Sequence, residues 1–397
     1  MKWEKLRLSQ VAEYITDGDH QPAPKAKSGI SFIKIKDIEN NSISFDSAIY
    51  VPDDYYNRLP SNRKPQQGDV LYTVVGSYGI PVYVQTDKKF CFERNIALIH
   101  PNNRVYPLFL YYSLLNPLAK KIVDSIANGS AQKLIPLSKL ERIELNIPSL
   151  LIQNKITNVL SSFDRLISIN QKQIKLLEEA AQRLYKEWFV DLRFPGHETT
   201  PIVNGIPEGW THGELGDIAF DSGKKERKDQ REKYLYYLPI DNMPKHSLTY
   251  MKKDSISLAE SSLVGFKKND ILFGSMRPYF HKVVIARDKG LTRTTCFVVN
   301  AKSSLYWSYL LMLLFSKDTI DYATSISVGT TMPYVRWKDF IHMNIVVPPE
   351  RLCATYQEHL SPIIDQLSCL ATSCEKLIQA RDRLLPKLMS GEMEVQK

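Results

Sequence analysis

The sequence predicts an α+β protein with two copies of one α/β domain, each followed by a long helix, and the two helices packed as an antiparallel coiled coil. The apolar skeleton of the first half returns in order in the second. Gly129 and Pro148 thus have counterparts 200 positions later, at Gly329 and Pro348. Repeats of this length indicate two domains and not a solenoid, whose units are far shorter. The expected segments are a first domain at 1–149, a first long helix at 150–192, a linker at 193–209, a second domain at 210–349 and a second long helix at 350–391.

The first domain is expected to place buried strands before a helix. Residues 31–38 alternate apolar and polar side chains, which is typical of a half-buried strand. Residues 70–75 are almost all apolar and predict a strand buried on both faces. Residues 108–126 predict a helix that is interrupted near Asn116 and Pro117, because proline has no N–H to donate. Further strands are expected at 80–84, 96–99 and 143–147.

The second domain is expected to repeat these elements. Residues 235–240 parallel the alternating strand of the first domain, and residues 270–273 parallel its buried strand. Residues 306–322 predict the matching helix. Proline and glycine punctuate the linker between the halves, which indicates an irregular connection. Further strands are expected at 281–286, 295–299 and 341–347.

Both long segments place apolar residues at steps of four and three, the spacing of a coiled-coil seam. Each seam has one polar position, Asn170 in the first and Arg381 in the second. Each seam covers about 37 residues, which as a helix extend roughly 55 Å. Two like units joined head to tail present equivalent surfaces only if these helices run in opposite directions. The alternative is two unrelated amphipathic helices, each packed on its own domain. Pro362 predicts a kink or a fresh helix start. The apolar seam positions are Ile152, Ile156, Leu160, Phe163, Ile167, Ile174, Leu177, Ala181, Leu184 and Trp188 in the first helix, and Leu352, Tyr356, Leu360, Ile363, Leu367, Leu370, Cys374, Leu377, Leu384 and Leu388 in the second.

The composition narrows the class of protein. Hydrophobic residues make up 43% and charged residues 24% of the chain, as in ordinary globular proteins. The net charge of +9 favours a polyanionic partner, with double-stranded DNA or another nucleic acid the best fit. The longest nearly apolar run, 305–315, is too short to cross a bilayer, and no signal peptide follows Met1, so we expect a soluble, cytoplasmic protein. The five cysteines form no C-x-x-C pair, and neither disulfides nor zinc are expected.

The motifs of DNA-modifying enzymes are missing. The nearest strings to the Asn/Asp-Pro-Pro-Tyr/Phe motif of amino-methyltransferases, at 116–118 and 332–334, do not fit it. Neither a G-x-G-x-x-G turn nor a phosphate-binding loop occurs, and the eight histidines have no metal-ligand spacing. Asp53 with residues 87–89 imitates part of a nuclease site, a pattern that arises by chance in chains of this length. We therefore expect a binding protein without catalytic residues or a metal.

Reading base edges requires hydrogen-bonding side chains on loops that a rigid scaffold holds. The two copies differ at such positions, as two different half-sites would require. Arg277 is the strongest candidate, because Pro278 beside it should make its position rigid. The alternative for each lysine and arginine is an ordinary solvated charge, and for the run at 224–228 a phosphate contact. The candidates are His20, Gln21, Ser77, Tyr78, Arg94, Asn95, Ser130, Gln132 and Lys133 in the first domain, and Lys224, Lys225, Arg227, Lys228, Arg277, Tyr279, Arg293, Thr294, Thr295, Thr330 and Thr331 in the second.

Several motifs occur twice in one order along the whole chain. The strings at 3–12 and 207–219 open the two domains, and the strings Gly-Asp-Val-Leu at 68–71 and Asn-Asp-Ile-Leu at 269–272 start their buried strands. The most specific string is Leu-Tyr-Lys-Glu-Trp-Phe-Val-Asp at 184–191, followed by Phe-Pro-Gly. Together these motifs resemble those of the specificity subunits of type I restriction-modification systems. One departure concerns Gln153, which matches the family pattern at the start of the first long helix, whereas Cys353 replaces it in the second.

The resemblance implies a mechanism. Each domain would be a target-recognition domain that binds one part of a split DNA sequence, and the paired helices would fix the gap between the parts. Two methyltransferase (modification) subunits carrying S-adenosylmethionine would dock on the chain and methylate adenine N6. Restriction endonuclease-translocase subunits, which use ATP and Mg, would complete the complex, and this chain itself would need no cofactor. Two alternatives are a stand-alone two-domain DNA-binding protein and a structural adaptor whose purpose is the coiled coil.

Overall fold

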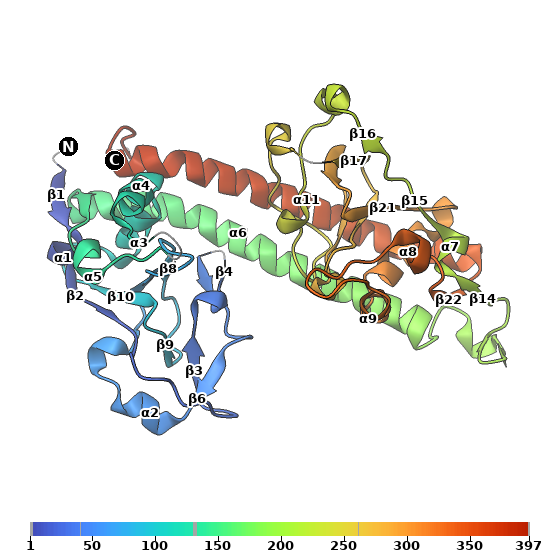
Figure 1. The fold of residues 1–397 in the computed structure, drawn as a ribbon, viewed down its shortest axis with the longest axis horizontal. Coiled ribbons are helices and arrows are strands. Elements are labelled where there is room, and N and C mark those ends of the chain that lie inside the picture. Colours follow the sequence, from blue (N-terminus) through green and yellow to red (C-terminus); the bar gives the residue numbers. More distant parts are fainter. Residues whose placement is uncertain (1–2, 40, 130–132, 261, 396–397) are drawn as a thin grey trace. The chain divides into compact units, whose positions relative to one another are not determined.

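The computed structural model describes residues 3–39, 41–129, 133–260 and 262–395 (Figure 1). It divides into two compact units, Met1–Arg165 with Ile378–Lys397, and Leu166–Leu377. Each unit contains one α/β domain and part of each long helix, α6 (Leu150–Tyr185) and α11 (Glu350–Ser390). The unit boundaries therefore fall inside the long helices and not at the ends of the α/β domains.

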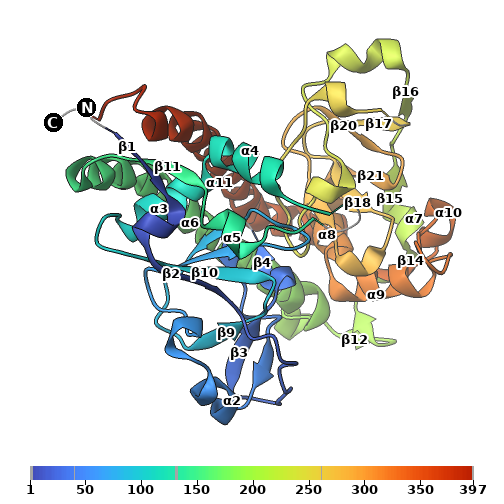
Figure 2. The same cartoon turned by 60° about the vertical axis from the view of Figure 1, so that its left-hand side comes forward.

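The first unit contains a four-stranded antiparallel sheet in the order β2-β10-β7-β8 and a three-stranded sheet in the order β6-β3-β9. In Figure 2 the second of these sheets, with β3 and β9, lies below β2 and β10. The strands are β1 (Glu4–Arg7), β2 (Ala12–Asp17), β3 (Ile30–Ile33), β4 (Ile38–Glu39), β5 (Ser42–Ile43), β6 (Ile49–Val51), β7 (Val70–Thr73), β8 (Pro81–Tyr83), β9 (Phe90–Phe92), β10 (Ile96–Pro101) and β11 (Glu144–Ile147). The helices of the domain are α1 (Leu8–Val11), α2 (Asp53–Arg58), α3 (Pro107–Leu115), α4 (Pro117–Ile126) and α5 (Leu137–Leu140).

The second unit repeats the four-stranded sheet in the order β15-β21-β18-β19, and its other sheet has the order β16-β17-β20. The strands are β12 (Ile202–Val203), β13 (Ile206–Pro207), β14 (Thr211–Glu214), β15 (Ala219–Asp221), β16 (Lys225–Glu226), β17 (Leu263–Phe266), β18 (Ile271–Gly274), β19 (Val283–Ile285), β20 (Gly290–Arg293), β21 (Cys296–Ala301) and β22 (Asn344–Val347). The helices of the domain are α7 (Leu215–Ile218), α8 (Trp307–Leu314), α9 (Lys317–Ser325) and α10 (Trp337–Phe340). The predicted duplication is confirmed, because β1 pairs with β11 just as β14 pairs with β22.

The repeated Asp at the start of the buried strand has the same structural task in both units. This residue is Asp69 in the first unit and Asp270 in the second. In both, Oδ2 accepts a hydrogen bond of 2.7 Å from the backbone N–H of the residue three positions earlier. The residue before it has a positive φ, 98° at Gly68 and 70° at Asn269. Glycine and asparagine are the residues that tolerate this conformation most readily. The motif is therefore a turn that leads into the strand.

Two strand predictions are wrong in part. The strand at 31–38 ends at Ile33, because the Asp37 carboxylate accepts a hydrogen bond from Lys34 N (2.9 Å) and closes a 3₁₀ turn. Residues 235–240 form no strand but a bridge at Tyr237, which pairs with Leu291 and Asp254. Pro239 has no N–H to extend this pairing. The bridge of Tyr237 with Leu291 nevertheless runs parallel to β20, as β3 runs parallel to β9, and the antiparallel strand β17 pairs with the other edge of β20.

The predicted helices are present at the expected places but differ in detail. The break near Asn116 is confirmed between α3 and α4, where the Asn116 side chain caps Leu118 N (3.1 Å). The helix expected at 306–322 is broken in the same way at Ser316, whose hydroxyl accepts a hydrogen bond from Thr319 N (3.3 Å). The helix α6 continues through a π-helical turn at Lys186–Val190. Of the two alternatives at Pro362, the fresh helix start is wrong, since α11 runs through this residue, and the kink stays a prediction.

The long helices pack against each other in antiparallel fashion within each unit. In the second unit, Asn170 Nδ2 donates to Ser373 Oγ (3.1 Å), and the rings of Trp188 and Tyr356 lie 5.4 Å apart. As the residue number rises along α6, the number of the residue that it contacts on α11 falls, as expected for antiparallel helices. In the first unit the polar seam residue Arg381 forms an ion pair with Asp164 (2.6 Å). Both polar seam positions therefore have partners, and the predicted coiled coil is confirmed.

The buried stripe on these helices is wider than the predicted seam. The side chain of Ile364 is 5% exposed, whereas its neighbour Ile363, which we predicted at the seam, is only partly buried. Tyr185 and Met389, both outside the predicted seam, are also buried. Each helix packs on its partner helix and also on the α/β domain of the same unit, so that a broader face is covered than in a simple two-stranded coiled coil. Within the part of the chain described, none of the helices is long and apolar enough to cross a membrane.

Candidate nucleic-acid interface

Most candidate residues of the first domain lie where β7 ends and β10 begins. Backbone hydrogen bonds connect three loops there: Val74 N donates to Asn95 O (2.9 Å), and Gly76 N donates to Lys133 O (3.1 Å). These bonds place Ser77 and Tyr78, Arg94 and Asn95, and Lys133 on neighbouring loops. The side chains of Ser77, Arg94 and Lys133 are exposed. The candidates Ser130 and Gln132 lie outside the described residues.

A cationic and aromatic cluster surrounds Tyr78. The ammonium group of Lys120 lies 4.3 Å from the centre of the Tyr78 ring, and that of Lys133 lies 5.8 Å from it. The Tyr78 hydroxyl donates to Asp124 (2.8 Å), and hydrogen bonds from Lys120 and Tyr78 lower the pKa of this carboxyl. Lys120 comes from α4 and is therefore not among the loop residues predicted from the sequence. A lysine just after a helix N-terminus was its only signal.

His20 and Gln21 are exposed beside acidic groups. His20 Nε2 lies 2.8 Å from Asp17 Oδ2, and Asp19 pairs with Arg63 (3.6 Å). A β-bridge between Asp19 and Glu93 places this segment next to the turn that carries Arg94. The surrounding carboxylates make this edge less suited to a phosphate than the surface near Tyr78.

The second unit builds the same three-loop arrangement with other side chains. Ser275 N donates to Thr295 O (2.9 Å), and Arg277 N donates to Pro333 O (2.7 Å). These bonds match those of Val74 and Gly76 in the first unit. They bring together the loops that carry Arg277 and Tyr279, Thr294 and Thr295, and Thr330 and Thr331. Tyr279, Thr294, Thr330 and Thr331 are exposed.

Arg277 is held in place, as its sequence neighbours predict. Its φ is 50°, and it precedes the 3₁₀ turn Pro278–Phe280. Its Nη2 donates to Thr331 O (3.2 Å), and its guanidinium carbon lies 6.0 Å from the centre of the Phe280 ring. The side chain is half-buried, so that part of its donor capacity holds the neighbouring loop. A direct role in reading bases remains a prediction.

The basic run of the second domain lies along the sheet β16-β17-β20. Lys225 pairs with Val264 of β17, which in turn pairs with Thr292 of β20. At the end of β20, Arg293 Nε donates to the hydroxyl of Tyr237 (2.7 Å). The exposed cations of this run are Lys224, Lys225, Arg227 and Lys228. They form a positive edge on the same domain that carries the three loops.

Buried polar contacts attach each domain to the long helices, and the sequence did not reveal them. In the second unit, Glu178 of α6 accepts hydrogen bonds from Ser247 Oγ (2.6 Å) and Leu248 N (2.7 Å), while burial raises its pKa. On α11, Glu375 pairs with Arg287 (3.0 Å), whose side chain is 6% exposed. In the first unit, Tyr112 of α3 donates to Asp164 of α6 (2.5 Å).

Gln153 connects the start of α6 to its own domain. Its side chain is fully buried, and its Oε1 accepts from Tyr106 N (2.8 Å) while its Nε2 donates to the carbonyls of Arg104 (3.0 Å) and Pro148 (2.9 Å). In the second unit, where Cys353 replaces it, the Tyr306 hydroxyl donates to Pro348 O (3.2 Å). The departure from the family pattern at Cys353 therefore changes an internal contact.

We expect Gln153→Ala to lower the free energy of unfolding by about 2–3 kcal/mol, because buried backbone groups lose their partners. Urea denaturation of the full chain measures this loss. Asn154→Ala, at the exposed next position of α6, is the matched control and should change little. Equal stabilities of the two variants would contradict the role given to Gln153.

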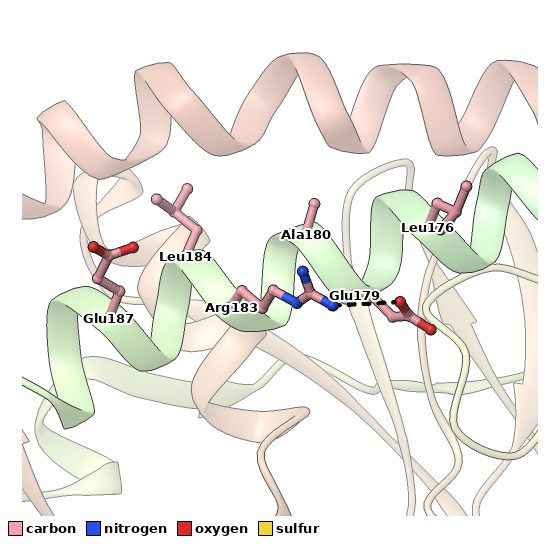
Figure 3. Close-up of a pocket in the computed structure, with 6 residues that line it drawn as sticks. All are labelled: Leu176, Glu179, Ala180, Arg183, Leu184 and Glu187. Atoms are coloured by element: carbon pink, nitrogen blue, oxygen red, sulfur yellow. Dashed lines mark ion pairs between the residues drawn. The ribbon is translucent and has the colours of Figure 1, made fainter.

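A shallow depression lies on one face of α6 in the second unit (Figure 3). Leu176 at its edge is 64% exposed, and Glu179 and Arg183 form an ion pair across it (3.9 Å). Its lining residues are Leu176, Glu179, Ala180, Arg183, Leu184 and Glu187. Such a helix face suits contact with another protein better than catalysis. Among the described residues, no group of three or more His, Cys, Asp or Glu side chains is placed to hold a metal ion.

Comparisons with known proteins agree with the duplicated fold. The family model of the type I restriction modification DNA specificity domain matches residues 1–179 and 207–379. The MjaIX specificity subunit of Methanocaldococcus jannaschii is 29% identical over 329 residues, which cover 77% of this chain and 72% of the relative. The HindI specificity subunit of Haemophilus influenzae is 29% identical over 197 residues, which cover 48% of this chain and 41% of the relative.

A solved structure supports the fold. The type I restriction-modification S subunit from M. genitalium aligns with a TM-score of 0.59 at 15% identity, over 98% of this chain and 96% of that chain. The family model covers most of the chain and matches it twice, once in each half. The chain therefore belongs to the type I restriction-modification DNA specificity family, the non-catalytic DNA-recognition subunits of restriction-modification complexes.

Proposed function

We propose that this chain reads a two-part DNA target, with one part bound by the domain of each unit. The supporting observation is that both domains hold three loops with equivalent backbone hydrogen bonds but carry different side chains there. Gly76 and Arg277 occupy the same place, each with a positive φ and each donating its N–H to the matching loop. One scaffold with two sets of base-contacting side chains is what two different half-sites require.

The same proposal gives the long helices and the partner subunits their roles. The paired helices set the number of unread base pairs between the half-sites. Two methyltransferase subunits, which carry S-adenosylmethionine, dock on the chain and methylate adenine N6, and restriction subunits with ATP and Mg complete the assembly. The exposed apolar residues Leu166, Ile169 and Leu176 along α6 offer a surface for such protein contacts.

Mapping N6-methyladenine in the host genome, with and without the gene for this chain, tests the function. We expect a motif of two short sequences separated by a fixed gap, and we expect its methylation to disappear with the gene. The purified chain alone should transfer no methyl groups to DNA, and robust transfer by it would contradict the proposal. A stand-alone DNA-binding protein would bring down no methyltransferase on purification, and an adaptor would show no salt-dependent binding to duplex DNA.

We expect Arg277→Ala to relax or weaken recognition of one half-site and to leave the other unchanged. The loss should be about 1–3 kcal/mol of discrimination if the guanidinium contacts guanine in a bidentate manner.

Lys225→Ala should instead weaken binding evenly across sequences and reduce the salt slope by about one unit if Lys225 contacts a phosphate. Methylome sequencing of both variants measures the effects. An unchanged motif and occupancy in Arg277→Ala would reject its role.

A further inference from the structure

The loop between Val328 and Tyr334 in the second unit has an apolar tip. Met332 at this tip is 55% exposed, and Tyr334 at the base of the loop is 46% exposed. Tyr279, on the neighbouring loop beside Arg277, is also 46% exposed. Large apolar side chains at the tip of a surface loop gain little unless a partner covers them. Their place among the three loops of the candidate interface points to DNA as that partner.

This loop is held rigidly. Val328 N donates to Tyr334 O (2.9 Å) and Tyr334 N donates to Val328 O (3.0 Å), which closes the loop at its base. Gly329 has a φ of 99°, which a residue with a side chain would adopt only under strain. Arg277 also holds this loop, because its backbone N–H donates to Pro333 O and its Nη2 donates to Thr331 O. A loop that is already ordered loses little conformational entropy when its tip is buried against a ligand.

The equivalent loop of the first unit has the same base, and its sequence differs at the tip. Asn128 N donates to Leu134 O and Leu134 N donates to Asn128 O, both at 2.8 Å. In the sequence, Met332 stands where the first loop has Gln132. The second half therefore places an apolar side chain at a position where the first half has an amide that can form hydrogen bonds.

We propose that Met332 reads a thymine in the half-site of the second unit through contact with the 5-methyl group of that base. This inference rests on the proposed function. The thymine methyl is the apolar group that base edges present in the major groove, so it is the feature that an apolar tip can distinguish. The exposed side chains of Arg293, at the end of β20, and Thr294, on the loop that follows, supply polar contacts around it. Besides the base contact proposed for it above, Arg277 positions this loop, because its Nη2 donates to the carbonyl of Thr331.

Duplexes in which deoxyuridine replaces one thymine at a time test this contact. They carry the motif found by methylome sequencing, and they are bound by the full chain with any methyltransferase that copurifies. At one thymine, we expect the loss of the methyl group to weaken binding about fourfold, the effect of one buried methyl group. Met332→Gln introduces the residue of the first loop. In this variant the duplexes with thymine and with deoxyuridine should bind about equally well. In Met332→Leu, which keeps an apolar tip, the thymine preference should remain.

Three results would overturn the assignment. They are the lack of any deoxyuridine-sensitive thymine, an unchanged sensitivity in Met332→Gln, and a motif without thymine in the half-site that this variant affects. An increase of 2-aminopurine fluorescence on binding that Met332→Gln abolishes would show insertion between bases, and it would replace the methyl contact. If the unmodified chain binds no duplex at all, the proposed function fails, which is a distinguishable outcome.

Discussion

Adding one helical turn to both long helices at the boundary of the units should lengthen the unread gap of the target by one or two base pairs. About four residues inserted between Arg165 and Leu166, and about four between Leu377 and Ile378, add roughly 6 Å of helix. DNA rises about 3.4 Å per base pair. The boundary lies between the polar contacts of Asp164 in the first unit and those of Asn170 in the second, so that both sets remain. The two half-site sequences should not change.

Methylome sequencing of the double insertion reads the gap directly. The matched control is the same insertion in α6 alone. It shifts the apolar seam positions of α6 on one side of the insertion by about four residues relative to those of α11. We expect that variant to lose stability and methylation and to acquire no new gap. A changed half-site sequence with an unchanged gap in the double insertion would contradict the role given to the helices.

Removing the guanidinium of Arg287 should destabilise the second unit by about 3 kcal/mol, because Glu375 then keeps a buried charge with less compensation. Arg287 donates to Glu375 Oε2 (3.0 Å) and to Thr372 Oγ1 (2.9 Å), and its side chain is only 6% exposed. Lys253 also pairs with Glu375 (2.9 Å), which limits the loss. Chemical denaturation of Arg287→Ala, followed by hydrogen exchange of residues 210–349, measures the effect.

Two controls separate burial from charge. Lys317→Ala removes a partner of Asp321 in an exposed ion pair of the same unit, and we expect no measurable loss. The double variant Arg287→Met with Glu375→Leu replaces the buried pair by apolar side chains and should recover much of the stability. If Arg287→Ala is as stable as Lys317→Ala, the pair does not attach the domain to α11.

The local predictions succeeded where one short stretch determines its own structure. The break at Asn116 and Pro117 follows from the missing N–H of proline and from the capping amide, both within three residues. The seam on α6 and α11 follows from the spacing of apolar residues along one helix. The strand predicted at 235–240 is reduced to a bridge because a strand depends on its partners: Tyr237 pairs with Leu291 and Asp254, and Pro239 has no N–H to extend this pairing.

The candidate interface was predicted only in part for the same reason. Ser77, Arg94 and Lys133 could be chosen from loop composition, but only the backbone bonds of Val74 and Gly76 show that their loops are neighbours. Lys120 was missed because it lies on a helix, and its position over the Tyr78 ring depends on how α4 packs.

The sequence by itself determined the duplication, the order of most strands and helices, the seam of the long helices and the resemblance to the family. These properties follow from patterns that repeat along the chain and need no knowledge of distant contacts. Only the tertiary structure decided which loops meet at the interface and how each domain is attached to α6 and α11. Those contacts join residues such as Glu178 and Ser247, or Arg287 and Glu375. Their burial and pairing arise when the chain folds, so no local pattern of residues records them.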